Sequence, residues 1–259
     1  MSADEPDWKD AMFRQHASVF KRVLDARPAH VDVPGLRALL PKRCAPGQRL
    51  AVLDLGCGSG RLLAPLSEVG SVVVGLDYSP ELLSLAADAV QPLHNVVLMQ
   101  GDMRHLPAVL PGAQFQLIAR AYTSLGYFER SQELGILRAC HAMASDDGCI
   151  VIDTFNAGWF RTHGQIERSS AADGFLLEES YRWDEAACSV HCRWRYRVGE
   201  QVLQEIPFVL GGYDLTDVDA LLHEAGWQRD RLIRDIGCLD PVPGSSELER
   251  LVVVARKLA

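Results

Sequence analysis

The stretch "AVLDLGCGSGRLLAPL", residues 51–66, decides the fold of this chain. An apolar run meets Asp54, three glycines follow at alternate positions (Gly56, Gly58 and Gly60), and a helix-like segment begins after them. In a doubly wound sheet, ligands bind outside the carboxyl ends of the strands. Glycine lets a ligand approach the backbone closely. The stretch therefore predicts a cofactor-binding turn between a strand and a helix.

The segments on either side of this turn alternate between short apolar runs and helix-like patterns. Strands are predicted at 50–55, 72–77, 95–99, 115–122 and 149–155, with two more near 231–236 and 248–255. Helices are predicted at 61–68, from Pro80 with Ser79 as cap, and at 132–143. Alternating strands and helices indicate an α/β protein with a doubly wound, mainly parallel, seven-stranded sheet covered on both faces.

Two regions depart from this alternation. The helical spacing of residues 8–24 is followed by a loop rich in Pro and Gly at 34–47. The segment "CSVHCRWRYRV", residues 188–198, alternates strictly and predicts an antiparallel insert with its neighbours at 175–183 and 202–210. Thr216 then caps a helix that ends near Gly226. We expect an N-terminal helical cap (1–47), a cofactor-binding core (48–157), an antiparallel β insert that covers the substrate (158–212) and the C-terminal part of the core (213–259).

Composition narrows the classes of partner. The 259 residues carry a net charge of −8, from 26 basic and 34 acidic side chains, which argues against nucleic acid as a partner. No run approaches about 18 apolar residues, and the acidic N-terminus does not resemble a signal peptide. Seven cysteines without regular spacing suggest neither a disulfide framework nor a metal site. We expect a cytoplasmic protein with no membrane partner.

The glycine spacing separates two classes of nucleotide cofactor. A dinucleotide fold has the pattern G-x-G-x-x-G, with its third glycine where this chain has Arg61, whereas the spacing here is D-x-G-x-G-x-G from Asp54. Asp77 ends the second strand, where a carboxylate can accept both ribose hydroxyls of an adenosine. After the third strand, Asp102 offers an acceptor for an adenine amino group, and Met103 offers an apolar lid with its amide as donor.

Three segments in this order, "VLDLGCGSG", "GLDYSPELL" and "GDMRHLP", resemble the S-adenosylmethionine (SAM)-dependent methyltransferase superfamily with the Rossmann-like seven-stranded fold. The resemblance is strong over residues 50–156 and looser over 213–259. It implies that SAM is the cofactor, that S-adenosylhomocysteine is a product, and that the glycine turn wraps the methionine end. The cofactor-binding residues that the resemblance implies are Asp54, Gly56, Cys57, Gly58, Gly60, Arg61, Asp77, Tyr78, Asp102, Met103, Ala121 and Tyr122.

The end of the fourth strand bears on the substrate. Many nucleic-acid and protein-glutamine methyltransferases carry Asn/Asp-Pro-Pro-Tyr/Phe there, whereas this chain has Ala121-Tyr122-Thr123-Ser124. "TSLGYF" and "VIDTFN" instead resemble bacterial small-molecule methyltransferases, some of which, including aminosugar N-methyltransferases, carry an antiparallel insert in the same place. The resemblance implies methyl transfer to an oxygen or nitrogen of a small molecule by a monomer or homodimer.

Candidate catalytic residues each have a plainer alternative. Tyr122 can orient the substrate or simply pack, and Asp153 and Asn156, at the end of the fifth strand, can act in catalysis or serve as turn and helix caps. His105, His141 and His163 are candidate bases, but a lone histidine without a visible partner is more often an ordinary surface or core residue. The segment 159–163 is a candidate loop over the pocket.

The arginine stripe and the overall activity also leave alternatives open. Arg193, Arg195 and Arg197 either bind an anionic substrate or form a solvated face paired with Glu178 or Glu205. Besides a small-molecule methyltransferase, the same cofactor motifs fit an RNA or protein methyltransferase, an enzyme that cyclises or cleaves SAM, and a non-catalytic SAM-binding module.

Overall fold

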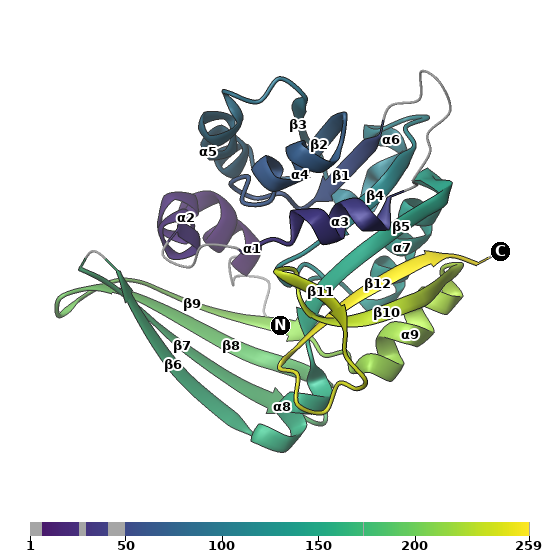
Figure 1. The fold of residues 1–259 in the computed structure, drawn as a ribbon. Coiled ribbons are helices and arrows are strands. Elements are labelled where there is room, and N and C mark those ends of the chain that lie inside the picture. The colour runs from purple at the N-terminus through teal and green to yellow at the C-terminus, as the bar shows by residue number, and fades with distance from the viewer. Residues whose placement is uncertain (1–6, 26–29, 41–49, 173, 259) are drawn as a thin grey trace.

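The computed structural model describes residues 7–25, 30–40, 50–172 and 174–258, which build two separate sheets (Figure 1). The larger sheet has eight strands in the order β11-β10-β12-β5-β4-β1-β2-β3, and the smaller has four in the order β6-β7-β8-β9. The strands are β1 (Ala51–Leu55), β2 (Val72–Asp77), β3 (Val96–Gln100), β4 (Phe115–Arg120), β5 (Ala144–Phe155), β6 (Gln165–Ala172), β7 (Phe175–Asp184), β8 (Ser189–Val198), β9 (Gln201–Gly211), β10 (Trp227–Asp235), β11 (Cys238–Pro241) and β12 (Arg250–Lys257).

Helices cover both faces of the larger sheet. They are α1 (Trp8–Asp10), the π-helical turn η1 (Ala11–Gln15), α2 (Ala17–Asp25), α3 (Val33–Leu39), α4 (Leu63–Val69), α5 (Pro80–Val90), the 3-10 turn η2 (Met103–His105), α6 (Leu106–Val109), α7 (Arg130–Met143), α8 (Ala157–His163) and α9 (Leu215–Glu224). No helix within the described ranges has both the length and the apolar character needed to cross a membrane.

The pairing of the larger sheet confirms the predicted α/β class. β1 pairs in parallel with β2 and β4, β2 with β3, and β4 with β5, while β12 runs antiparallel between β5 and β10. The sheet has eight strands rather than the predicted seven, because β11 adds to the edge of β10 through the short register Ile233↔Pro241 and Asp235↔Cys238. Four residues are too few to carry a recognisable strand pattern in the sequence.

Several predicted boundaries were wrong near the N-terminus. The predicted helix at 8–24 is interrupted by η1, and the first part of the predicted loop at 34–47 is α3. Pro34 is tolerated in the first turn of α3 because its missing amide hydrogen is not needed there, and the Asp32 side chain accepts the Gly35 amide. The rest of that loop, 41–47, lies outside the described residues.

Two further differences concern the insert and the last helix. β6 precedes the three predicted insert strands and pairs antiparallel with β7. The cap of α9 is Asp214 rather than Thr216, because Asp214 and Asp217 form a reciprocal capping box, each side chain accepting the other residue's amide at 3.0 Å.

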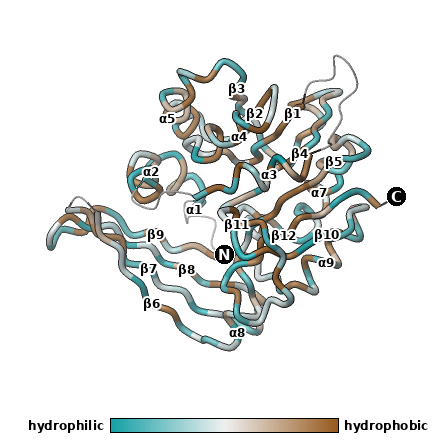
Figure 2. The backbone as a smooth tube through the Cα atoms, viewed as in Figure 1, coloured by the Kyte–Doolittle hydropathy of each residue, from teal (hydrophilic) through white to brown (hydrophobic). Residues whose placement is uncertain are grey.

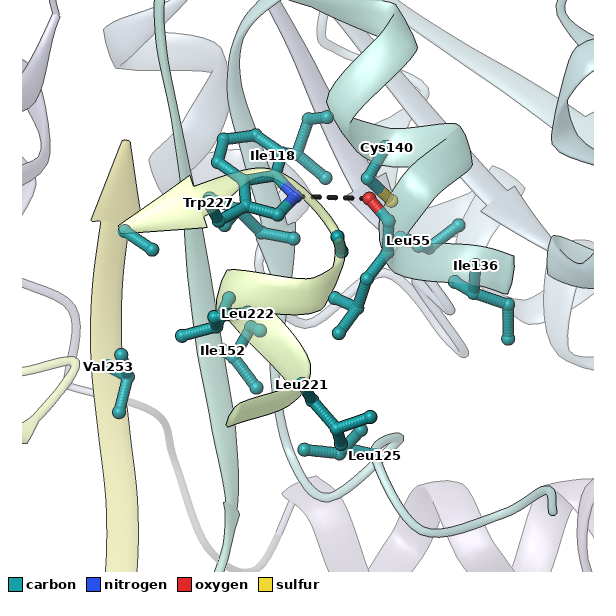
Figure 3. Packing of buried hydrophobic residues seen from close by; sticks show 14 of the residues in the cluster. Leu55, Ile118, Leu125, Ile136, Cys140, Ile152, Leu221, Leu222, Trp227 and Val253 are labelled. Atoms are coloured by element: carbon teal, nitrogen blue, oxygen red, sulfur yellow. Dashed lines mark hydrogen bonds between the residues drawn. The ribbon is translucent and has the colours of Figure 1, made fainter. Parts of the chain in front are cut away.

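The core on one face of the larger sheet is built around Trp227. Its indole Nε1 donates to the Leu137 carbonyl at 3.0 Å, which satisfies the only polar atom of the side chain (Figure 3). Leu221 and Leu222 of α9 pack in the same cluster as Ile136 of α7. In Figure 2 the strands in the middle of this sheet are largely brown, whereas β6 to β9 change repeatedly between brown and teal.

The smaller sheet has two different faces and extends away from the body of the molecule (Figure 1). On its outer face Arg195 pairs with Glu205 at 2.7 Å, and Arg197 pairs with Glu178 at 3.2 Å. The arginine stripe is thus the solvated, cross-strand-paired face that the sequence left as one alternative. The inner face carries buried apolar and aromatic side chains, including Leu177 and Tyr196.

Candidate active site

The glycine turn after β1 is held by backbone bonds to β2. The amides of Gly56 and Cys57 both donate to the Leu76 carbonyl, at 2.8 and 3.0 Å. Gly58 has φ +55, and a Cβ there would meet nothing within 4 Å, so its backbone faces open space. Gly60 has φ +88 and a different task, since a Cβ there would lie 3.2 Å from Ala86 of α5. The turn exposes backbone on one side and packs closely on the other.

Two buried carboxylates support this turn from behind. Asp77 Oδ2 accepts the Gly58 amide at 2.8 Å and its Oδ1 accepts the Ser79 amide at 2.9 Å, while burial raises the pKa of Asp77. Asp54 is 2% exposed, and within the described part of the chain its Oδ2 atom has no hydrogen-bond partner. Burial, and then the charge of Asp77, raise the pKa of Asp54 to about 7. Two acidic groups therefore lie behind the turn, and burying them in their charged form costs much free energy.

The segment after β3 forms the next wall. The Asp102 carboxylate caps η2 by accepting the Arg104 amide at 2.8 Å and also pairs with the Arg104 guanidinium. The Met103 methyl lies 3.2 Å from the position that a Cβ on Gly56 would take. Met103 therefore closes over the glycine turn, whereas the Asp102 carboxylate is already engaged and would have to share its lone pairs with an adenine amino group.

One cavity of about 650 Å³ joins these elements to the inner face of the smaller sheet. It is bounded by the glycine turn, the segment after β4, the N-terminal helices and strands β7 to β9. The predicted cofactor residues that line it are Gly56, Cys57, Gly58, Arg61, Asp77, Tyr78, Asp102, Met103, Ala121 and Tyr122. Asp54 and Gly60 do not line it, because they lie behind the turn.

The segment after β4 is strained in a specific way. Tyr122 and Thr123 have φ 57 and 71, a conformation that non-glycine residues seldom adopt and that is least favourable for a β-branched side chain. Asp153 Oδ2 accepts the Tyr122 amide at 2.9 Å, and its Oδ1 accepts Arg250 Nε at 2.7 Å. Arg250 in turn donates to Thr123 Oγ1 at 2.6 Å. Asp153 thus positions this segment and does not itself line the cavity.

Tyr122 lies against the glycine turn. The Arg61 guanidinium sits 4.4 Å from the centre of the Tyr122 ring, and both residues line the cavity. Burial raises the pKa of Tyr122 to about 12. Its hydroxyl therefore stays protonated near neutral pH, where it can donate a hydrogen bond and does not act as a base.

Asn156 has a structural task. It is the N-cap of α8, with Oδ1 accepting the Gly158 amide at 3.0 Å, and its Nδ2 donates to the carbonyls of Ser245 and Leu248 at 2.8 and 2.7 Å. All its polar groups are used, and it does not line the cavity. The geometry favours the helix-cap alternative over a catalytic role.

The remaining candidates lie away from the cavity. The segment 159–163 is part of helix α8 rather than a loop over the pocket. His163 stacks on Trp159, His141 packs against Trp227, and His105 is largely exposed. No histidine is among the described residues that line the cavity, so none of these three is placed as a base. Within the described ranges, no three His, Cys, Asp or Glu side chains are grouped so as to hold a metal ion.

The sequence did not reveal one buried ion pair beside the site. Arg120 and Glu133 have fully buried side chains, and the guanidinium donates to Glu133 Oε2 at 2.6 Å. Glu133 Oε1 also accepts the amides of Gly126 and Phe128, which fixes a segment that lines the cavity. A charged residue in the first turn of an ordinary helical pattern gives no sign that it is buried.

Comparison with known proteins defines the class of this enzyme. Residues 52–148 match the family described as "Methyltransferase domain". The chain is 24% identical over 262 residues to the putative methyltransferase YqeM of Bacillus subtilis (strain 168), covering 95% of this chain and 97% of that protein. Solved structures share the fold, among them two bacterial methyltransferases. The CcbJ methyltransferase of Streptomyces caelestis has a TM-score of 0.73 at 21% identity, covering 91% of this chain and 90% of the other.

The second is SAM-bound CalS10 of Micromonospora echinaspora, an amino pentose methyltransferase, with a TM-score of 0.67 at 20% identity, covering 93% of this chain and 97% of the other. The fold and the glycine turn define an α/β methyltransferase. The chain is a SAM-dependent methyltransferase with a Rossmann-like sheet and an antiparallel insert, and its cofactor is SAM.

Proposed function

We propose that this methyltransferase transfers a methyl group to an oxygen or nitrogen atom of a small molecule held between the two sheets. The observation that carries the proposal is that the glycine turn and the aromatic inner face of β7 to β9 line the same cavity. At about 650 Å³ it is of the size that proteins use for small ligands. The amino pentose methyltransferase named above, which shares the fold, is consistent with such a substrate.

The residues that suit SAM lie at the turn. The open backbone of Gly58 and the buried carboxylates of Asp54 and Asp77 suit a cationic nucleotide ligand, since close approach and negative charge are both provided. We assign the ribose to Asp77 and an apolar contact with the adenine to Met103. SAM supplies a methyl group already activated on a sulfonium.

The protein's own contribution is alignment and exclusion of water. Arg250 and Asp153 hold Tyr122 and Thr123 in their strained conformation beside the turn, which fixes one wall of the acceptor space. Fixing two reactants in line removes several kcal/mol of barrier without any covalent chemistry by the protein. The N-terminal helices contribute Trp8 and Phe13 to the cavity lining and so cover it from solvent.

A macromolecular substrate is disfavoured by the charges around the cavity. Three of the basic side chains that line it are paired with acidic partners: Arg104 with Asp102, Arg168 with Glu249, and Arg250 with Asp153, the last two at 2.7 Å. Among the residues that the structure describes, such pairs leave no broad positive surface around the cavity for a phosphate backbone. The outer arginine stripe is likewise matched by glutamates.

Mass spectrometry of SAM incubated with the protein tests the proposal, with and without a pool of small hydroxy and amino metabolites. We expect S-adenosylhomocysteine and a methylated product only when the pool is present. Methylthioadenosine formed without any acceptor would instead show cleavage of SAM. Methylation of added RNA or protein but of nothing in the pool would replace the small molecule by a macromolecule. Failure of every acceptor, with SAM bound and unchanged, would favour the non-catalytic module.

A further inference from the structure

A closed ring of five aromatic side chains joins the N-terminal helices to the smaller sheet. Its successive ring centres lie 5.9 Å apart for Trp8 and Phe13, 5.2 Å for Phe13 and Phe20, 6.2 Å for Phe20 and Trp194, 5.5 Å for Trp194 and Phe208, and 5.2 Å for Phe208 and Trp8. All five residues line the cavity. We call this set the aromatic collar.

The π-helical turn η1 gives the collar its N-terminal half. In an α-helix, residues five apart point about 140° away from each other, because each residue turns the chain by about 100°. In η1 the turn is wider, and the His16 amide donates to the Ala11 carbonyl five residues earlier at 3.0 Å. The wider turn brings Trp8 and Phe13 toward one face, where their rings meet. Such turns are rare and occur frequently at functional sites.

The collar lies next to the segment that follows β2, to which we assign the cofactor. Phe13 meets Tyr78 edge to face at 6.4 Å, and its carbonyl accepts the Ser79 hydroxyl at 2.7 Å. The Tyr127 ring, which also lines the cavity, contacts Trp8 at 5.2 Å and Phe13 at 5.8 Å. A ligand held by the collar would therefore lie beside the cofactor, where an acceptor has to be.

The charges of the cavity lining favour an uncharged ligand. The Lys9 ammonium lies 4.8 Å from the centre of the Trp8 ring, and the Arg250 guanidinium lies 5.0 Å from that of Phe155. Other rings of the lining carry Arg61, Arg104 and Arg168 in the same manner. A cationic ligand would be placed beside these charges. An anionic one would have to compete with the carboxylates that already pair with Lys9 and Arg250.

We propose that the aromatic collar binds an uncharged aromatic ring of the acceptor, so that the substrate is a small hydroxy- or amino-aromatic compound. This inference rests on the proposed function, since it names a substrate class for the same cavity. A planar ring can make edge-to-face and offset contacts with the collar, each of which adds to the gain from burial. A saturated ring of the same size gains only from the burial of its apolar surface.

Four compounds with a single ring test the proposal at pH 7: benzyl alcohol, cyclohexylmethanol, protonated benzylamine and benzoate. Their affinities for the full chain are measured by calorimetry and by saturation-transfer NMR, with S-adenosylhomocysteine present. We expect benzyl alcohol to bind about fivefold more tightly than cyclohexylmethanol, the effect of one aromatic pair. Because the saturated ring buries at least as much apolar surface, hydrophobicity alone would not produce this preference. Both charged compounds should bind more weakly than benzyl alcohol.

Variants on the two sides of the collar sharpen the test. Trp194→Leu, in the smaller sheet, and Phe20→Leu, in α2, should each reduce the preference for benzyl alcohol to less than about twofold. Trp194→Phe keeps an aromatic ring but loses the indole N–H that donates to Tyr181, and it should retain the preference. The control is Trp183→Leu on β7, which is not among the residues that line the cavity. The wild-type comparison remains decisive if a variant does not fold.

Three results would overturn the inference: equal or tighter binding of cyclohexylmethanol, tighter binding of a charged compound than of benzyl alcohol, or a preference that both leucine variants of the collar retain. Binding of none of the four compounds, with S-adenosylhomocysteine bound normally, would overturn it too. Methylation of a saturated compound from the metabolite pool would support the proposed function and contradict the role of the collar. Failure to bind S-adenosylhomocysteine alone would count against the cofactor site instead.

Discussion

The two sheets of this enzyme use charged side chains in opposite ways. Along the carboxyl edge of the larger sheet the acidic groups are buried and few, and most are bonded to backbone amides, as Asp77, Asp153 and Glu133 are. On the outer face of the smaller sheet they form an exposed ladder of arginines and glutamates. The number of ion pairs is thus a poor guide to their importance, because burial sets the energy at stake.

The largest expected effect comes from the buried pair. Glu133→Gln leaves the Arg120 guanidinium, whose side chain is fully buried, without its carboxylate. We expect the free energy of unfolding to fall by about 3–5 kcal/mol, measured by urea denaturation. The control is Glu224→Gln, which breaks the exposed pair with Arg130 and should cost less than about 1 kcal/mol. Equal losses would remove the contrast between the two kinds of pair.

A pH-dependent effect follows from Asp54, whose folded pKa of about 7 lies above the ordinary value of 3.8. Between these pH values Asp54 keeps its proton in the folded protein but has lost it in the unfolded chain. Protonated Asp54 therefore contributes stability that is fully present below about pH 4 and is lost as pH rises through 7. Asp54→Asn has no such loss. We expect its stability relative to wild type to increase by the order of 2–4 kcal/mol from pH 4 to pH 8. Thermal denaturation of both proteins across that pH range measures this change. A stability difference that does not depend on pH would contradict the prediction.

Two glycines with a positive φ allow the effect of backbone strain to be separated from the effect on cofactor binding. Gly58 and Gly112 have φ +55 and +70, and a Cβ at either would meet nothing within 4 Å, but only Gly58 lines the cavity. Valine at each position should cost about 1–2 kcal/mol of stability. Only Gly58→Val should weaken SAM binding, by at least about 100-fold, or roughly 2.7 kcal/mol. Calorimetry with both variants measures this, and similar affinities would remove the turn from the cofactor site.

The ribose assignment predicts a smaller change. Asp77→Ala removes an acceptor for the ribose hydroxyls and also releases the Gly58 amide. We expect SAM affinity to fall at least about tenfold, the value of one hydrogen bond to a charged group. Calorimetry again gives the number. Unchanged affinity would sink the ribose assignment.

The smallest effect is expected on the exposed ladder. Arg195 pairs with Glu205 at 2.7 Å and with Glu178 at 3.5 Å, and the three side chains are 34–38% exposed. Arg195→Met should change the free energy of unfolding by less than about 1 kcal/mol, and less still at high salt. Denaturation at low and high salt tests this. A loss as large as that of Glu133→Gln would mean that the outer face is a site of its own.

The parts of the fold that the sequence predicted well have strong local patterns. β2 was predicted residue for residue, and the cap of α5 is Ser79, whose side chain accepts the Leu82 amide. The strands of the insert were found because buried and exposed residues alternate along β7 to β9. β6 and β11 were not predicted. β6 is mainly polar and β11 has four residues, so neither carries a clear strand pattern, and each is defined only by its pairing with a neighbouring strand.

By itself the sequence determined the class of enzyme and predicted one half of the candidate site. The glycine spacing and the acids after each strand are local, and parallel strands bring their carboxyl ends to one edge whatever the rest of the chain does. Only the tertiary structure decided the other half. Whether Glu179 faces the cavity or the solvent, and whether Asp153 contacts a ligand or the Tyr122 amide, depends on partners such as Arg250 that are distant in sequence. The free-energy cost of burying those carboxylates depends on how the molecule packs around them, which the local sequence does not specify.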